Sequence, residues 1–233
     1  IKYIKQENGG KHIAHNTAVL NSEGELVVCL DSDDVLTEDA IEVAIDFWQK
    51  NAKPHNTGIL AKRGNMEDRK PICAELPQEV TECTMFDLTN KYGFTGDTIL
   101  YFRRDILEKN LFKSFQNERF IPETNMYIDV DKHGTMLLLD KVLYLCEYLP
   151  DGLTAKYHSL LERNPNGTAD TYFKQMCMAK EFKTKVKYGL LTNIYKSLSS
   201  NKKELQFNEN KLLLALLWIP ANLMKEKFLG RFK

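Results

Sequence analysis

The fold is decided by Leu26-Val27-Val28-Cys29-Leu30-Asp31-Ser32-Asp33-Asp34, in which an apolar run ends abruptly in an acidic loop. A short apolar run of this kind is typical of a strand that is buried on both faces of a parallel sheet. Thr37-Glu38-Asp39 can cap a helix after the loop, and apolar residues recur at helical spacing from Ala40 to Trp48. Strand, loop and helix in this order predict an α/β domain whose ligand binds at the carboxyl end of the strand.

The acidic loop predicts a metal site. Its three carboxylates lie within four residues and repel one another, so a hard divalent cation, Mg²⁺ or Mn²⁺, is the natural counter-charge. Substrate phosphates commonly complete the coordination of such an ion. The alternative is a solvated acidic turn that caps the next helix.

Apolar spacing and turn residues predict the other elements. Helices are expected at Lys11–Leu20, Ala169–Ser199 and Glu209–Phe232, and strands at Thr57–Ala61, Thr98–Phe102, Met136–Leu139 and Val142–Tyr148. We expect Asp140-Lys141 to be the turn between the last two strands. Asn164-Pro165-Asn166-Gly167 is expected to be a turn that precedes a helical C-terminal part.

Composition limits the class of protein. The 233 residues are 43% hydrophobic and 27% charged, which suits one globular domain with or without an appendage. The 32 basic residues equal the 32 acidic ones, which argues against a nucleic-acid partner. Five cysteines without CxxC spacing indicate reduced thiols in a cytosol-like compartment. The longest apolar run, 212–221, has ten residues including Pro220, too few for a transmembrane helix, which needs roughly 20.

Four segments give the chain a resemblance to a known family. They are Asn8-Gly9-Gly10-Lys11-His12-Ile13-Ala14-His15-Asn16, the stretch Gly24–Asp34, Phe120-Ile121-Pro122-Glu123, and Tyr148-Leu149-Pro150-Asp151-Gly152-Leu153-Thr154. Together they resemble the inverting family 2 glycosyltransferases of bacterial surface-polysaccharide synthesis, over roughly residues 1–160. The resemblance implies a GT-A fold, a Rossmann-like mixed sheet flanked by helices. We expect this domain at 1–160, with the N-terminal part of its nucleotide-binding half missing, and a helical extension at 161–233.

The resemblance also implies a nucleotide-sugar donor, a UDP-sugar above all. Asp31 would face the ribose or diphosphate and, with Asp33, would hold the metal, while Asp34 would assist. Lys11, His15 and Asn16 would bind the donor as well, since the start of the Lys11–Leu20 helix suits an anion.

An inverting transfer needs a general base, which the resemblance places at Glu123. Glu118 and Asp129 are nearby competitors, and the alternative role for Glu123 is to cap a helix that starts after Pro122. Gly96 and Asp97 are candidates for acceptor binding, because a carboxylate beside glycine can approach sugar hydroxyls closely. A plain turn is the other interpretation of this pair.

Other functions remain as alternatives. A haloacid-dehalogenase-type phosphatase also places Asp-x-Asp after a strand, but it needs a second acid where this chain has Tyr101. A non-catalytic fragment is the third hypothesis. His12 and His15 have the spacing of a metal pair without a third ligand, and His158 is expected to be a surface residue.

The helix expected at Glu209–Phe232 carries many leucines and a basic end. It could lie on an anionic membrane where lipid-linked acceptors reside, or pack on the domain or on a second copy of the chain. The expected location is therefore the cytoplasm, with peripheral contact at the inner face of the cell membrane.

Overall fold

The computed structural model describes residues 1–147 and 156–230. Contacts divide the chain into two compact units. One unit, here called the sheet unit, consists of Ala18–Leu111 and Asp129–Pro150, and the other, the helical unit, consists of Ile1–Thr17, Phe112–Ile128 and Asp151–Lys233. The expected domain boundary at residue 160 stays a prediction.

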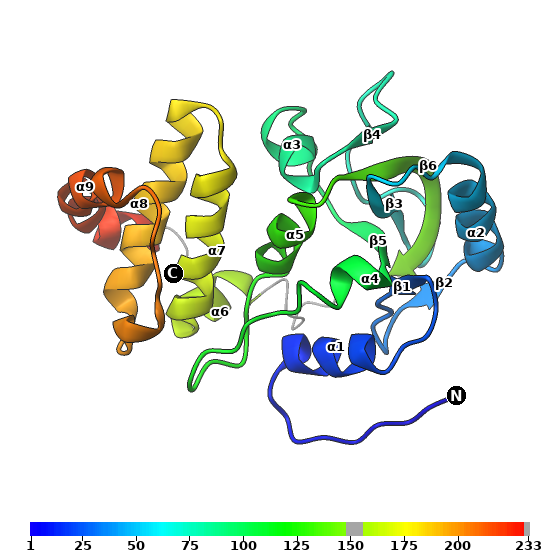
Figure 1. Cartoon of the computed structure of the whole chain (residues 1–233), viewed down its shortest axis with the longest axis horizontal. Helices are drawn as coiled ribbons and strands as arrows, with labels where there is room; N and C mark the ends of the chain where they lie inside the picture. Colours follow the sequence, from blue (N-terminus) through cyan, green and yellow to red (C-terminus); the bar gives the residue numbers. More distant parts are fainter. Residues whose placement is uncertain (148–155, 231–233) are drawn as a thin grey trace. The chain divides into compact units, whose positions relative to one another are not determined.

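Figure 1 labels the elements of both units. The sheet unit contains β1 (Leu26–Val28), β2 (Val35–Leu36), α2 (Ala40–Asn51), β3 (Asn56–Asn65), β4 (Glu82–Cys83), α3 (Met85–Asn90), β5 (Thr98–Arg103), α4 (Arg104–Leu107) and β6 (Thr135–Cys146). The helical unit contains α6 (Tyr157–Arg163), α7 (Pro165–Met178), α8 (Phe182–Leu198), the 3₁₀ turn η1 (Lys202–Glu204) and α9 (Lys211–Leu229). Two helices, α1 (Lys11–Leu20) and α5 (Thr124–Asp131), begin in the helical unit and end in the sheet unit.

The sheet is mixed, with strand order β1-β5-β3-β6-β2 and with β4 paired to β6. Only β3 and β6 pair in parallel among the described strands. The prediction that Leu26–Leu30 is a buried strand of a parallel sheet is therefore wrong in its details. β1 has three half-buried residues, lies at the end of the strand order and runs antiparallel to β5. An apolar run does not specify which strand will lie beside it, so its neighbour comes from the rest of the chain.

The expected turn at Asp140-Lys141 is also absent. Residues 135–146 form one continuous strand, β6. Its register with β3 shifts between the pairs Ala61–Leu139 and Lys62–Val142, so Asp140 and Lys141 form a bulge within the strand. The Lys62 Nζ lies 2.5 Å from Asp140, and the Lys141 Nζ lies 2.5 Å from Asp39. Polar residues can thus interrupt the apolar pattern without ending the strand.

Helix α2 covers the sheet through the residues that the sequence predicts. Ala40, Ala44 and Trp48 are buried in one core cluster with residues of β3, β5 and β6. In Figure 1, α2 lies alongside the curled strands β3 and β6. This packing fixes the position at which the acidic loop leaves β1 and returns through β2.

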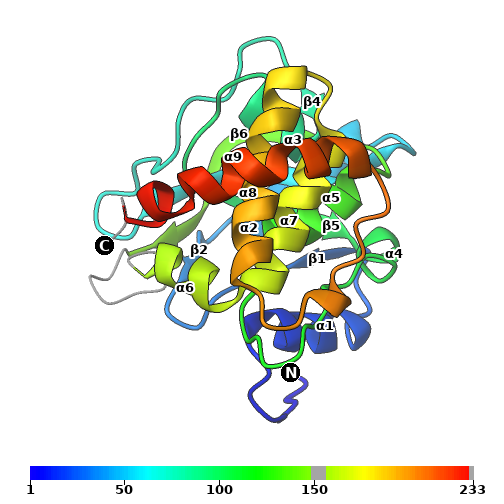
Figure 2. The ribbon, with the colours of Figure 1, turned by 90° about the vertical axis from the view of Figure 1, so that its left-hand side faces the viewer.

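The helical unit differs from the single helix expected at Ala169–Ser199. The chain forms two helices, α7 and α8, separated by the extended residues Ala179 and Glu181. Because the chain reverses, Tyr172 stacks on Tyr188 and Tyr195, with ring centroids 6.2 and 5.6 Å apart, which one straight helix could not allow. The expected turn at 164–167 is the start of α7, with Pro165 in its first turn. Helix α9 continues through Pro220 and lies against α8 (Figure 2).

One buried carboxylate couples this fold to pH. Asp131, at the end of α5, accepts hydrogen bonds from the Met85 and Phe86 N–H groups at the start of α3, at 3.0 and 2.8 Å. Burial raises the pKa of Asp131 to about 6, against the lowering effect of these two hydrogen bonds. A raised carboxylate pKa means that the folded state binds more protons than the unfolded state between pH 4 and 6.

We therefore expect the contribution of Asp131 to the free energy of unfolding to fall as pH rises through this window, by about 3 kcal/mol. Urea unfolding of wild type and Asp131→Asn at pH 4 and pH 7 measures it, with Asp129→Asn on the same helix as control. The free energy of unfolding of Asp131→Asn, relative to that of wild type, should be higher at pH 7 than at pH 4. A difference that is the same at both pH values contradicts the raised pKa.

Candidate active site

A buried tyrosine holds the acidic loop between β1 and β2. The Tyr144 hydroxyl donates a hydrogen bond to Asp34 Oδ2 at 2.5 Å and accepts one from the Asp31 backbone N–H at 3.2 Å. A turn closes the loop through the Asp34 N–H and the Asp31 carbonyl, 3.2 Å apart. The guanidinium of Arg63, which is opposite Tyr144 in the β3–β6 register, lies 4.3 Å from the centre of its ring. One face of the loop is thus anchored while Asp33 is exposed.

The charges around this loop favour a cation. Burial raises the pKa of Asp34, the Tyr144 hydrogen bond opposes this, and the negative charges of Asp33 and Asp31 raise it further. Burial and the hydrogen bond to Asp34 also raise the pKa of Tyr144, so its hydroxyl remains a donor at neutral pH. Within residues 1–147 and 156–230, no three His, Cys, Asp or Glu side chains form a ready metal cage. Two carboxylates that need oxygen ligands from a substrate fit Mg²⁺ or Mn²⁺.

Asp97 belongs to the same neighbourhood. Burial raises the pKa of the Cys146 thiol, and the negative charges of Asp34, Asp97 and Asp31 raise it further. The structure therefore gathers around one strand end Asp97, predicted to bind the acceptor, and the carboxylates predicted to bind the donor.

The backbone at position 96 requires a glycine for structural reasons. Its φ is +96° and it forms an isolated bridge with Cys73, where an added Cβ would lie 2.4 Å from the Cys73 Cα. Such a position requires glycine whether or not a ligand binds. The turn interpretation of this residue therefore has direct support, while acceptor binding by Asp97 stays a prediction.

A second group of predicted residues meets in the helical unit. The Lys11 Nζ lies 3.0 Å from Glu123 Oε1, and the Tyr127 hydroxyl donates to Glu123 Oε2 at 2.9 Å. Burial lowers the pKa of His15, the charge of Glu123 raises it, and the charge of Lys11 lowers it. The His15 ring packs edge-on against Phe112, with centroids 5.2 Å apart. Lys11, His15 and Glu123, predicted separately from distant motifs, are thus neighbours.

The capping alternative for Glu123 is correct for its backbone. The Glu123 carbonyl accepts hydrogen bonds from the Met126 and Tyr127 N–H groups, so α5 does begin there. Its side chain is 47% exposed and reaches Lys11 and Tyr127. Starting the helix therefore leaves the carboxylate accessible to a substrate.

The competing bases have other partners. Glu118 accepts hydrogen bonds from the Asn166 and Gly167 N–H groups at 2.7 and 2.8 Å and so caps α7. Burial raises the pKa of Glu118, against these two hydrogen bonds. Asp129 forms an ion pair with Lys132 at 2.8 Å.

Three other residues named from the sequence are Asn16, His12 and His158. The side-chain amide of Asn16 donates to the Phe112 carbonyl at 2.8 Å and accepts from the Phe112 N–H at 2.9 Å, which ties α1 to a loop 96 residues further along the chain. Nucleotide binding by Asn16 stays a prediction. His12 is buried, as a metal ligand open to solvent would not be. His158 is exposed on α6, as expected for a surface histidine. The family-like segment Tyr148–Thr154 lies outside the described residues.

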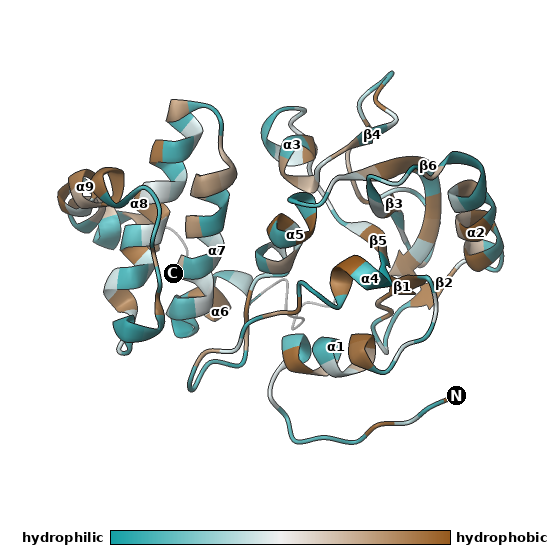
Figure 3. Cartoon of the chain, viewed as in Figure 1, coloured by the Kyte–Doolittle hydropathy of each residue, from teal (hydrophilic) through white to brown (hydrophobic). Residues whose placement is uncertain are grey.

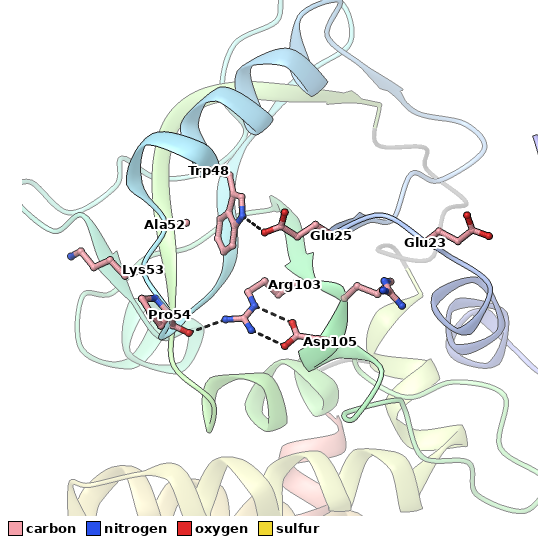
Figure 4. Close-up of a pocket in the computed structure, with 9 residues that line it drawn as sticks. Glu23, Glu25, Trp48, Ala52, Lys53, Pro54, Arg103 and Asp105 are labelled. Carbon is pink, nitrogen blue, oxygen red and sulfur yellow. Dashed lines mark hydrogen bonds and ion pairs between the residues drawn. The ribbon is translucent and has the colours of Figure 1, made fainter.

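A wide cavity of about 520 Å³ lies at the opposite end of β1 from the acidic loop. Figure 4 shows that several of its polar groups pair with one another. The Trp48 Nε1 donates to Glu25 at 2.8 Å, and Arg103 binds both Asp105 and the Pro54 carbonyl. Because ligands of open α/β sheets bind at the carboxyl ends of strands, this cavity is on the wrong side for the donor.

Tyr144, Arg63 and Tyr127 were not predicted from the sequence. Tyr144 stands between Leu143 and Leu145 in β6, and Arg63 stands between Lys62 and Gly64 near the end of β3. Only their pairing in the sheet brings Tyr144 and Arg63 together at the loop. Tyr101, where a dehalogenase-type phosphatase needs an acid, is a buried residue of β5 that is 2% exposed, which leaves that alternative without support.

Comparisons with known proteins concern the family and the fold. Residues 1–111 match the family model described as Glycosyl transferase family 2. No curated protein matches the chain in sequence. The structure is similar to that of S. aureus TarS 1–349 in complex with UDP-GlcNAc, with a TM-score of 0.53 and 16% identity over 94% of this chain and 62% of that chain. A second structure of TarS 1–349 gives a TM-score of 0.51 and 12% identity over 97% of this chain and 73% of that chain.

The structural match and the family match support different conclusions. At such low identities the likeness to TarS, a GT-A enzyme, establishes the fold. The chain spans 62% of the length of the first TarS structure, so substrates and partners do not transfer with the fold. The sequence match supports the family that the resemblance implied. Residues 1–111, just under half of the chain, are similar in sequence to glycosyltransferase family 2, in a chain with the GT-A fold.

Proposed function

We propose that the protein transfers a sugar, with inversion, from a nucleotide-diphosphate-sugar to a saccharide or lipid-linked saccharide. The observation that carries the proposal is the acidic loop anchored by Tyr144 at the end of β1, inside a family 2 segment. The UDP-GlcNAc bound to TarS supports a UDP-sugar as donor. Bacterial surface-polysaccharide synthesis is the process in which such a transfer fits the resemblance.

On the donor side, Asp31 and Asp33 would hold Mg²⁺ or Mn²⁺. A divalent cation there offsets the negative charge that develops on the departing diphosphate. Tyr144 keeps the loop in one conformation by binding Asp34 and the Asp31 backbone. Asp97 adds a carboxylate that can accept hydrogen bonds from sugar hydroxyls.

On the acceptor side, Glu123 would remove the proton of the attacking hydroxyl. As the hydroxyl oxygen bonds to the anomeric carbon, the bond from that carbon to the diphosphate breaks on the opposite face, and the nucleoside diphosphate leaves with its electron pair. Lys11 and Tyr127 each hold one oxygen of the Glu123 carboxylate, which fixes the direction from which the hydroxyl must approach.

Calorimetric titration of the protein with UDP, in the presence and absence of Mn²⁺, tests the donor proposal. We expect UDP to bind more tightly with Mn²⁺. Transfer from UDP-sugars to saccharide acceptors then tests the reaction. Failure to bind UDP under both conditions would support the non-catalytic alternative instead.

A different observation supports a membrane location. Helix α9 exposes Leu212, Leu216, Trp218, Ile219, Leu223 and Met224, each between 49% and 80% exposed. Figure 3 shows α9 as a largely hydrophobic helix. Residues 180–230 also hold ten lysines against four glutamates. None of the described helices is long and apolar enough to cross a bilayer.

From the exposed apolar face and the excess of lysines, we propose that α9 lies on the anionic inner face of the cell membrane, which makes the protein a peripheral cytoplasmic one.

Replacing two exposed leucines of α9 with glutamate should abolish the contact with the membrane. We expect the variant Leu216→Glu/Leu223→Glu to lose co-sedimentation with anionic vesicles, because it removes apolar area and adds repulsion, while UDP binding stays unchanged. The control Gln206→Glu/Asn208→Glu adds the same charge outside the leucine face and should retain most binding. Equal binding by both variants would contradict the role of α9. A different outcome would indicate a homo-oligomer. In that case the wild-type protein does not bind vesicles but self-associates, and Leu216→Glu/Leu223→Glu abolishes the self-association.

A further inference from the structure

A cavity of about 220 Å³ lies within the helical unit, close to Glu123 in the chain. Pro122 and Thr124, the two neighbours of Glu123 in the chain, line it together with residues of α6, α7 and α8. The charge of Glu123 also contributes to raising the pKa of Tyr157, another lining residue, after the larger effect of burial. Glu123 therefore lies between two lining residues in the chain, and its charge reaches a third.

Three tyrosines from three helices form much of the cavity wall. They are Tyr157 of α6, Tyr172 of α7 and Tyr188 of α8. Tyr172 and Tyr188 are stacked at an interplanar angle of 23°. Tyr157 is 40% exposed and stands at the opening. Rigid aromatic faces of this kind pack well against the C–H faces of a sugar ring.

The cavity also contains polar groups that suit hydroxyls. Gln175 lines it, and the Gln175 Oε1 is buried without a hydrogen-bond partner in the described part of the chain. A buried acceptor without a partner is costly, so a ligand hydroxyl that donates to it would be favoured. Lys187 lies at the rim, with its Nζ 4.9 Å from the centre of the Tyr188 ring.

The size of the cavity restricts the ligand. At about 220 Å³ it is smaller than pockets for drug-sized molecules, which begin at about 300 Å³, and so is too small for a nucleotide-sugar. One sugar ring fits both this volume and the combination of aromatic walls with a single buried amide oxygen.

We propose that this cavity binds one neutral pyranose unit of the acceptor and so presents its hydroxyl to Glu123. The inference rests on the proposed function and specifies its acceptor side. The sugar ring packs against the partly exposed Tyr157, and one of its hydroxyls donates to Gln175 Oε1. The helical unit thereby supplies both the general base and the acceptor subsite.

Saturation-transfer NMR with free glucose, galactose and N-acetylglucosamine tests the proposal on the whole protein. Gln175→Leu removes the amide at nearly constant size, and Tyr157→Ala removes an aromatic wall that is already partly exposed. Tyr92→Ala is the matched control, because Tyr92 is similarly exposed, at 37%, in the sheet unit. We expect at least one of the sugars to bind to wild type and to the control, and each cavity variant to weaken it about tenfold or more.

UDP titration of the same variants separates this inference from the proposed function. Unchanged UDP binding together with weakened sugar binding supports both. If the protein binds UDP but no sugar, the cavity assignment alone is overturned. The same holds if it binds UDP and a sugar, and Gln175→Leu and Tyr157→Ala leave the sugar binding intact. Sugar binding that depends on Gln175 and Tyr157, in a protein that binds no UDP, keeps the saccharide site and overturns the transferase.

Discussion

Replacement of Glu123 by Gln is expected to lower the rate of sugar transfer by a factor of about 10² to 10⁴, the usual worth of a positioned general base. Glutamine keeps the size of the side chain and one oxygen for Lys11 or Tyr127, but it cannot take the acceptor proton. UDP binding should not change, because the predicted donor ligands are other residues. Steady-state rates with saturating donor, beside calorimetry with UDP, measure the two effects separately.

The competing carboxylates provide the controls for this experiment. Asp129→Asn should transfer sugar at nearly the wild-type rate, since Asp129 is paired with Lys132 at the protein surface. Glu118→Gln should lower thermal stability, because Glu118 caps two N–H groups of α7. Glu123→Gln should lower stability by less than about 1 kcal/mol, as expected for an exposed ion pair. A normal transfer rate in Glu123→Gln and a slow one in Asp129→Asn would assign the base to Asp129.

Replacement of Asp33 by Ala is expected to abolish the strengthening of UDP binding by Mn²⁺. Asp33 is exposed in the turn of the acidic loop, so the substitution removes a ligand without disturbing the Tyr144 anchor. We expect UDP affinity in the presence of Mn²⁺ to fall at least about tenfold, and affinity without the metal to change little. Calorimetry at matched concentrations with and without Mn²⁺ measures both UDP affinities.

Asp46→Ala is the matched control for the metal experiment. Asp46 is an exposed carboxylate on α2 that pairs with Lys50, so its loss changes the net charge by the same amount away from the loop. This variant should bind UDP and Mn²⁺ as wild type does. If Asp33→Ala still shows the full effect of Mn²⁺, the acidic loop is a structural turn and the metal site lies elsewhere.

The sequence alone determined the features that depend on neighbours in the chain. The helix expected at Lys11–Leu20 has those bounds in the structure, and Gly10 begins it with its N–H bound to the Asn8 side chain. The strand expected at Thr98–Phe102 is β5, and the helix expected at Ala40–Trp48 is α2. Apolar spacing, caps and short motifs are local signals, and they sufficed for these elements, whereas the GT-A fold was implied by the resemblance of four segments to family 2 glycosyltransferases.

Only the tertiary structure decided which strands and side chains meet. β1 pairs with a strand more than 70 residues away in the chain, and the Tyr144 hydroxyl reaches Asp34 across 110 positions. The contact of Lys11 with Glu123, the capping of α7 by Glu118 and the tyrosine cavity depend on the same kind of long-range packing. A residue's type and spacing state what it can bind, whereas its partner is set by burial and pairing between segments that the linear pattern does not connect. The sequence therefore proposes the chemical groups, and the fold alone assigns their neighbours.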